Sequence, residues 1–274
     1  MSAITRFIPK NHVSYFVGQL VHIPLPRFLS KIVITAFAKA YNISLAEAEF
    51  PVDHYPSLGE FFIRRLKPGL RPVADTWAVH PADSVITQAA PITSGRLIQA
   101  KNKTYSVESF TRDSSAMKKY DKGSFLTYYL CPTDYHRVHS PVTGEIKRVV
   151  YIPGALWPVN AWSTENIHEL FSVNERVLVE IETDRGLVGV MFVGATNVGQ
   201  IELAFDKEIR GNQLLSGAVQ EKTYEGQKIQ KGDELGMFRM GSTVVMLYAP
   251  NTISSDNLSE YINKQVRVNA QFRN

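Results

Sequence analysis

Residues 176–193, RVLVEIETDRGLVGVMFV, decide the fold. Two runs rich in apolar and β-branched residues, Arg176–Ile181 and Val188–Val193, flank a short segment with Asp and Gly, as neighbouring β-strands flank a turn. Similar runs occur at 84–87, 125–130, 145–150 and 243–248. We therefore expect an α+β protein whose larger domain, residues 73–274, is a mainly antiparallel β body.

Two turn segments indicate the kind of β body. Ser140–Ile146 and Glu225–Gly236 resemble the turns that join short strands in lipoyl- and biotinyl-type barrel-sandwich domains. No carrier lysine of those domains is evident here, so the resemblance implies a shared architecture and not a shared function. We therefore expect the body to be barrel-sandwich-like.

The N-terminal region, residues 1–72, has helical periodicity instead. Apolar residues recur at helical spacing between Val13 and Val21, and a second apolar stripe starts after Pro26 and comprises Leu29, Ile32, Val33, Ala36 and Phe37. The charged residues between Ile8 and Tyr41 are all basic. This pattern fits an amphipathic region that associates with a membrane surface. It fits equally well an ordinary helix packed on the core.

Two Ser-x-x-Glu sequences predict helix starts, because a serine cap and a glutamate three residues later form a capping box. They are Ser44–Glu47 and Ser57–Glu60, and the second predicts a short helix over Phe61–Leu66. Basic residues cluster nearby, at Arg64, Arg65, Lys67 and Arg71. We interpret the cluster as a solvated basic face, with contact to a phosphate or a lipid headgroup as the alternative.

The composition excludes several classes of protein. The 274 residues contain 30 Lys and Arg against 26 Asp and Glu, and the net charge of +4 is too small to indicate a nucleic-acid partner. A single cysteine, Cys131, excludes an intramolecular disulfide and a multi-cysteine zinc site. We see neither a secretory signal pattern nor a run of the roughly 20 apolar residues that a spanning helix needs. We therefore expect a soluble or peripheral membrane protein on the cytoplasmic side.

Two short segments contain candidate catalytic residues. Asp134–Pro141, DYHRVHSP, holds His136 and His139, and histidine is the usual general base near neutral pH. Two histidines do not make a metal site, and we expect no metal; hydrogen bonding within a turn is the alternative role. Phe238–Val244, FRMGSTV, contains a Gly-Ser-Thr step. This step lacks the Gly-x-Ser-x-Gly pattern of an α/β-hydrolase and is also compatible with a tight bend.

Taken together, these segments closely resemble bacterial-type phosphatidylserine decarboxylases. The resemblance covers most of the chain and rests on the order and spacing of several pieces. These are Phe61–Arg64, Pro81–Asp83, Tyr135–His139, Asn174–Val177, Val193–Gly199 and Gly241–Thr243. Ser84 follows Asp83 where the family commonly has glycine, and a positive φ at that position would put the placement of Asp83 in question.

The resemblance implies a proenzyme that cuts itself between Gly241 and Ser242. The Ser242 hydroxyl attacks the Gly241 carbonyl, and the ester that forms then eliminates. The products are a β chain, residues 1–241, and an α chain, residues 242–274, with a pyruvoyl group derived from Ser242. His139 matches the family's base for this step, and Asp83 matches the carboxylate that orients the base. His136 matches the histidine of the decarboxylation step.

The same resemblance implies the reaction. The pyruvoyl carbonyl forms a Schiff base with phosphatidylserine and takes up the electrons released as CO2 leaves, which yields phosphatidylethanolamine without an external cofactor. The implied place is peripheral, on the cytoplasmic face of the inner membrane, and a homo-oligomer is compatible with the sequence. Two alternatives stay open: a pyruvoyl decarboxylase of another serine-headed lipid or amino acid, and a non-enzymatic peripheral membrane β-sandwich protein.

Overall fold

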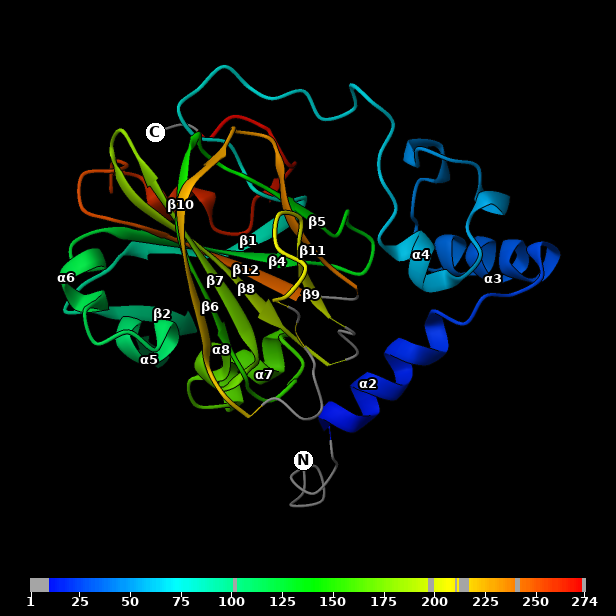
Figure 1. Ribbon diagram of the computed structural model, residues 1–274, viewed down its shortest axis with the longest axis horizontal. Helices are drawn as coiled ribbons and strands as arrows, with labels where there is room; N and C mark the ends of the chain where they lie inside the picture. The colour runs from blue at the N-terminus through cyan, green and yellow to red at the C-terminus, as the bar shows by residue number, and fades with distance from the viewer. Residues whose placement is uncertain are drawn as a thin grey trace.

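An antiparallel sheet forms the centre of the computed structural model, which describes residues 10–100, 103–196, 200–209, 211, 217–239 and 242–272 (Figure 1). Its eight strands lie in the order β10-β6-β7-β8-β12-β4-β1-β13. Their bounds are β1 Ser84–Pro91, β4 Ser124–Leu130, β6 Gly144–Ile152, β7 Arg176–Thr183, β8 Gly186–Gly194, β10 Gln220–Ile229, β12 Ser242–Tyr248 and β13 Gln265–Val266. All six predicted strands belong to this sheet, and the α+β prediction is confirmed. In the described part of the chain the sheet does not close into a barrel.

The hairpin of β7 and β8 shows why the quoted sequence folds as it does. The two strands pair from Thr183 opposite Gly186 to Arg176 opposite Val193. Gly186 has a φ of +129°, a backbone conformation that favours glycine. Most apolar side chains of both strands are buried in the main core, and Leu187 packs against it. Hydrophobic burial therefore stabilises the strand register that the turn sets.

Two smaller sheets and several short helices flank the main sheet. One sheet contains β5 Arg137–His139, β11 Glu234–Phe238 and β9 Ile201–Leu203, and the other pairs β2 Arg96–Ala100 with β3 Lys103–Ser106. The short helices are α5 Val107–Thr111, α6 Ala116–Tyr120, α7 Ala161–Asn166 and α8 Leu170–Val173, with the 3-10 turn η3 Leu258–Tyr261. The two barrel-sandwich-like turns contact each other: Ser140 N donates to Asp233 O, and Gly232 N donates to Ser140 O.

The N-terminal region is helical, as predicted, and extends to one side of the sheet (Figure 1). Its elements are α2 Lys10–Val21, α3 Arg27–Ala40, η1 Leu45–Glu47, η2 Val52–His54 and α4 Leu58–Phe62. The region has a small hydrophobic cluster of its own, distinct from the core of the sheet, formed by Ile34, Ala38, Ile43, Ala48, Tyr55 and Phe61.

Most of the predicted apolar stripe of α3 lies off the packed face of this helix, although Phe37 packs against the cluster of the N-terminal region. The buried residues of α3 are Ser30, Ile34 and Ala38. Two stripe residues, Leu29 and Ile32, are 39% and 62% exposed. The apolar surface that the sequence predicts is therefore available for contact with something outside this chain.

Two local predictions around α4 are corrected. Ser57 accepts a hydrogen bond from Glu60 N as a cap should, but Ser44 makes no such bond and precedes only the 3-10 turn η1. The helix after Ser57 ends at Phe62 instead of Leu66, because the following backbone pairs with residues 47–49: Glu49 N donates to Arg65 O and Lys67 N donates to Glu47 O.

The basic cluster after α4 is not the solvated face that we expected. Arg64 is buried, and the largely buried Arg71 donates hydrogen bonds to Glu47 and Asp83. Arg65 is exposed and forms an ion pair with Glu234. The expectation of a solvated face was wrong for Arg64 and Arg71. Arg64 is buried among neighbouring residues, and Arg71 pairs with carboxylates from elsewhere in the fold.

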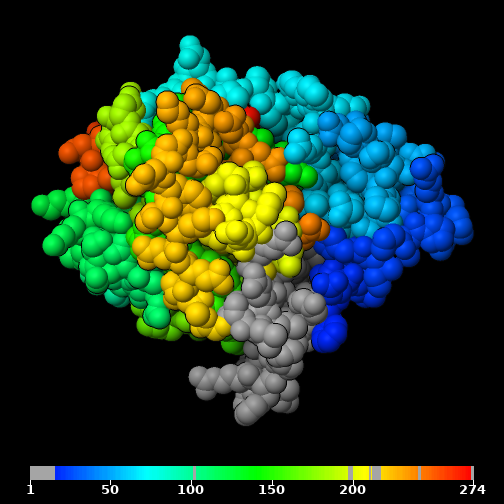
Figure 2. Space-filling view, viewed as in Figure 1, coloured from blue at the N-terminus to red at the C-terminus, as the bar shows by residue number. Residues whose placement is uncertain are grey.

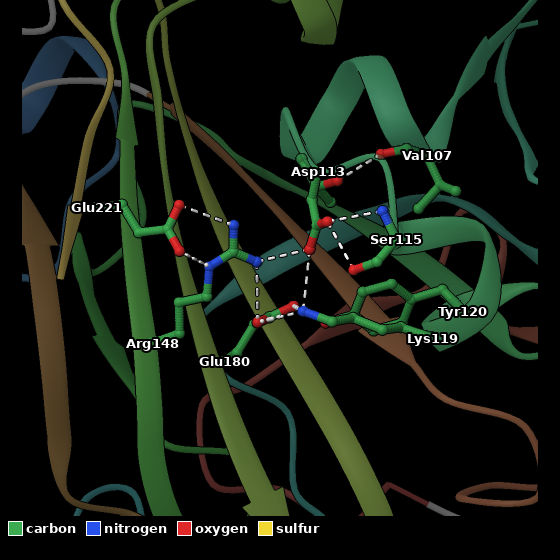
Figure 3. Close-up of polar contacts among 9 residues, drawn as sticks. Val107, Asp113, Ser115, Lys119, Tyr120, Arg148, Glu180 and Glu221 are labelled. Carbon is green, nitrogen blue, oxygen red and sulfur yellow. Dashed lines mark hydrogen bonds and ion pairs between the residues drawn. The ribbon is translucent and has the colours of Figure 1, made fainter. Parts of the chain in front are cut away.

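A charged network joins the α5–α6 segment to the β6 and β7 strands (Figure 3). Arg148 on β6 pairs with Asp113 at 2.7 Å, with Glu180 at 3.3 Å and with Glu221 at 2.8 Å. Lys119 pairs with Asp113 and with Glu180, each at 3.0 Å. Because Glu180 is buried, these partners are needed to compensate its charge.

Candidate active site

Ser242 is the first residue of β12 and lies deep inside the protein. It pairs with Leu130 of β4 on one side and with Gly194 of β8 on the other. Its hydroxyl is buried and has no hydrogen-bond partner in the described structure. Burying a polar group without a partner costs free energy, so such a group calls for an explanation, and a chemical role is one. The predicted cleavage partner, Gly241, lies outside the described residues.

Asp83 precedes β1 at the same end of the sheet. Val85 pairs with Tyr129, which places Asp83 beyond the end of β4, across that strand from Ser242. Ser84 begins β1 and is not among the residues with positive φ. The serine that replaces the usual glycine therefore causes no backbone strain and leaves the position of Asp83 intact.

The Asp83 carboxylate is fully engaged by two arginines and a backbone amide. Arg71 donates from Nη2 at 2.7 Å and from Nε at 3.1 Å, and Arg267 donates from Nη1 at 3.0 Å. Val268 N donates at 2.8 Å to Oδ1, the oxygen that also accepts from Arg71 Nε, whereas Arg71 Nη2 and Arg267 Nη1 donate to Oδ2. The buried Asp83 side chain is thus held in place by groups from both sides of the predicted cleavage point.

His139, on β5, is fixed as a neutral base. Its Nδ1 lies 2.7 Å from the carbonyl oxygen of Gly232, which can only accept, so Nδ1 carries the proton and donates. Its Nε2, left with a lone pair, accepts from the Tyr135 hydroxyl at 3.0 Å. Burial lowers the pKa of His139, which favours the neutral ring near pH 7. Gly232 has a φ of +90°, a backbone conformation that suits glycine.

His136 is fully buried beside an aromatic ring. Its Nδ1 donates to the carbonyl oxygen of Asp134 at 2.9 Å, and its Nε2 has no partner among the described residues. The ring centroid lies 4.1 Å from that of Phe62. Burial lowers the pKa of His136 to about 3, so the ring is neutral and Nε2 is a free acceptor.

The structure brings Asp83 and both histidines into one neighbourhood. His139 N donates to Pro81 O at 2.8 Å, two residues before Asp83. The charge of Asp83 is among the groups that oppose the effect of burial on the pKa values of His136 and His139. Among the described contacts, however, Asp83 makes no hydrogen bond to His139. Orientation of His139 by Asp83 therefore stays a prediction.

Sequence reasoning missed several residues of this site. Tyr135 lies within the histidine segment, but no pattern predicts that its hydroxyl contacts His139. Gly232 belongs to the Gly-Asp turn. This pattern predicts a bend, but it does not predict that the Gly232 carbonyl accepts a hydrogen bond from His139. Arg267 gave no signal, because its link to Asp83 spans 184 positions of the sequence.

Comparison with known proteins shows the family to which the chain is similar. The model of a family described as phosphatidylserine decarboxylase matches residues 58–272. A phosphatidylserine decarboxylase proenzyme of Myxococcus xanthus (strain DK1622) is 40% identical over 256 residues, which cover 93% of this chain and 91% of the relative. Proenzymes of the same name from Anaeromyxobacter sp. (strain K) and Vibrio vulnificus (strain YJ016) are each 38% identical. They cover 92% and 91% of this chain and 90% of each relative.

Proposed function

The chain belongs to the phosphatidylserine decarboxylase family, and we propose that it converts phosphatidylserine to phosphatidylethanolamine and CO2 with a pyruvoyl group made from its own Ser242. The observation that carries this proposal is the buried Ser242 hydroxyl, which has no described hydrogen-bond partner and lies at the end of the sheet where Asp83 also lies. The relatives are named proenzymes, which supports a chain that becomes active by processing.

In the processing step, Ser242 Oγ attacks the Gly241 carbonyl carbon and the bond from that carbon to the Ser242 nitrogen breaks. His139 takes the serine proton at Nε2, the nitrogen that its contact with Gly232 leaves unprotonated and from which the Tyr135 hydroxyl must first move. It then passes this proton to the departing Ser242 nitrogen. Elimination of the ester then removes the Cα proton of residue 242 and releases the carboxylate of Gly241. Addition of water and loss of ammonia leave the pyruvoyl group at the start of the 242–274 chain.

Asp83 supports this base through its negative charge. Its two arginines hold the carboxylate in place, and its charge favours the imidazolium that forms when His139 accepts a proton. This role resembles that of the carboxylate in a Ser-His-Asp triad, but it acts across space instead of through a direct hydrogen bond.

In the decarboxylation, the pyruvoyl group supplies a carbonyl that takes up the electron pair left behind by CO2. His136 presents its unpartnered Nε2 to the substrate, and Phe62 supplies an apolar wall beside it. An apolar surrounding disfavours a carboxylate charge more than neutral CO2, so it favours loss of the carboxyl group. We propose that His136 acts in this step and not in processing.

We further propose that the helical region, residues 1–72, binds the protein to the membrane that holds its substrate, on the cytoplasmic face of the inner membrane. Phe16, Leu20 and Phe28 are each 66% exposed, and Ile32 is 62% exposed. The helical region forms one end of the surface in Figure 2, beside the β body, residues 73–274. None of the described helices has the length and apolar content needed to cross a bilayer. The exposed apolar residues support a helical surface that lies in the interface.

Intact mass measurement of the purified protein tests the proposal. We expect two chains, residues 1–241 and 242–274, with the smaller one blocked at its first residue. Ser242→Ala and His139→Ala should stay uncut, whereas His136→Ala should be cut and should decarboxylate phosphatidylserine poorly. A stable uncut wild-type chain would contradict the pyruvoyl mechanism and favour the non-enzymatic alternative. Activity on free serine but not on phosphatidylserine would favour the soluble substrate.

A further inference from the structure

A polar cavity of about 150 Å³ lies beside Asp83, where the helical region meets the β body. Three arginines line it, and so do three carboxylates: Arg64, Arg71, Arg267, Glu47, Asp83 and Asp134. It is small and polar, which suits a charged headgroup and excludes acyl chains.

Most of these charges are already paired with each other. Arg71 bridges Glu47 at 2.8 Å and Asp83 at 2.7 Å, and Arg267 approaches Asp83 at 3.0 Å. Asp134 accepts a hydrogen bond from Cys131 N. These contacts hold the wall of the cavity together without any ligand.

Arg64 is the exception. Its residue is only 5% exposed, yet its Nε and Nη1 have no hydrogen-bond partner in the described structure. Its Nη2 makes one long contact, 3.4 Å to the carbonyl oxygen of Thr133, and its guanidinium lies 4.9 Å from the ring centroid of Phe61. A buried guanidinium without a hydrogen-bonded anion is costly, and an anionic ligand would remove much of that cost.

We propose that Arg64 binds the phosphate of the phosphatidylserine headgroup in this cavity; this inference rests on the proposed function. The cavity and the reacting groups are neighbours. Arg64 lies two residues after Phe62, the last residue of α4, and the Phe62 ring is tilted against that of His136 with 4.1 Å between the ring centroids. The charge of Arg64 is also among those that act on His136. In the lipid, one oxygen and one methylene carbon separate the phosphorus from the reacting α-carbon, so both sites must lie close together.

The phosphate is a better partner for Arg64 than the carboxylate of the same headgroup. The carboxylate loses its charge as CO2 leaves, so an arginine bound to it would stabilise the starting state more than the transition state. The phosphate keeps its charge throughout the reaction. An arginine bound to the phosphate therefore anchors the substrate without opposing the chemistry, and its loss should affect KM more than kcat.

The test compares Arg64→Met with Arg65→Gln, a change at the neighbouring arginine, whose side chain is 62% exposed. Processing needs no substrate, so complete self-cleavage of each variant shows that its fold and its processing chemistry are intact. With phosphatidylserine in detergent micelles, we expect Arg64→Met to raise KM about tenfold or more with kcat changed less than about threefold. Arg65→Gln should match the wild type. Arg64→Lys keeps the charge but not the planar guanidinium, so its KM should lie between those of the wild type and Arg64→Met. This variant replaces Arg64→Met in the test if the methionine variant does not fold.

Soluble probes identify the ligand chemistry. Glycerophosphoserine, the headgroup without acyl chains, should inhibit the wild type about tenfold more strongly than it inhibits Arg64→Met, whereas free serine should inhibit both equally. Inorganic phosphate that inhibits the wild type more strongly than glycerophosphoserine would make the cavity a free-phosphate site and overturn the assignment. An unchanged KM in a fully cleaved Arg64→Met would overturn it as well. A wild type that is uncut, or cut and inactive on the lipid, would contradict the proposed function instead.

Discussion

At Asp83, a single carboxylate accepts hydrogen bonds from Arg71, Arg267 and Val268 and leaves none for His139. His139 donates from Nδ1 to the Gly232 carbonyl, and its orientation by Asp83 stays a prediction. The sequence resemblance proposes Asp83 and His139 as site residues but does not predict their hydrogen-bond partners. A motif lists the side chains that take part, whereas hydrogen-bond partners depend on loops that meet only in the folded chain.

Replacement of Asp83 by asparagine tests whether its charge supports the base. Burial lowers the pKa of His139 and the Asp83 charge opposes that effect, so removing the charge should lower the His139 pKa further. Because the base must be neutral to accept a proton, the acid limb of the cleavage-rate profile should move to lower pH. We expect the plateau rate to fall about ten- to a hundredfold, since a weaker base accepts the serine proton less readily. Time courses of self-cleavage from pH 5 to 9 measure both effects.

An unchanged plateau rate for Asp83→Asn, or an acid limb that moves to higher pH, would contradict the electrostatic role. Arg65→Gln serves as the control for a surface charge change. It removes an exposed charge that pairs with Glu234 and does not contact Asp83 in the described structure.

At the scale of elements, the sequence predicts apolar strands better than polar or short ones. The six predicted strands contain runs of apolar and β-branched residues over four or more positions, and all six were found. β10 was missed because its residues are mostly polar, and β13 because it has only two residues. β5 and β9 have three residues each, too few for a period to show. The sequence pattern also does not predict the early end of α4, because this end depends on backbone pairing with residues 47–49.

The charged network of Figure 3 should make stability depend on pH. Burial by itself raises the pKa of Asp113, but hydrogen bonds from Ser115, Lys119 and Arg148 outweigh it and hold that pKa well below its usual range. A carboxylate with a depressed folded-state pKa stabilises the fold above its unfolded pKa of 3.8, and this contribution is lost as pH falls further. We expect Asp113→Asn to lower the free energy of unfolding by about 1–3 kcal/mol at pH 7.

Urea unfolding of the wild type and Asp113→Asn at pH 7 and near pH 3 provides the measurement. The difference between the two proteins should shrink at the lower pH, where the wild-type carboxylate loses part of its advantage. A difference that is equal at both pH values would mean that the ionised state of Asp113 contributes nothing to stability.

The exposed face of α3 should determine membrane binding without affecting processing. Phe28→Glu together with Ile32→Glu replaces two exposed apolar residues by anions. Each change removes about 1.5–3 kcal/mol of favourable free energy from burial of the side chain in the membrane interface. Sedimentation with vesicles that contain phosphatidylserine should show at least about tenfold weaker binding, with complete self-cleavage. Val219→Glu, an exposed apolar residue outside the helical region, is the matched control. Equal vesicle binding by all three proteins would rule out α3 as the contact surface.

At the scale of the whole molecule, the predicted cleavage divides the chain but not the fold. β12, the first element of the 242–274 chain, lies between β8 and β4 and is paired along its whole length, from Ser242 to Tyr248, on both sides. All seven of its residues are buried. The 242–274 chain also contributes Arg267 and Val268 to the surroundings of Asp83.

We therefore expect the cleaved chains to stay together as one folded unit. Separation would expose two rows of backbone hydrogen-bonding groups and the buried side chains of β12. The free-energy cost of this exposure is far larger than the conformational entropy gained by breaking one peptide bond at the start of a strand. Size-exclusion chromatography of the cleaved protein should give one peak that contains both chains by mass, and only urea or another denaturant should release residues 242–274. The two arginines of Asp83 come one from each chain. We therefore expect that removal of the small chain abolishes activity and that refolding the two chains together restores it. Release of the small chain in native buffer would mean that β12 is held less firmly than its position in the sheet requires.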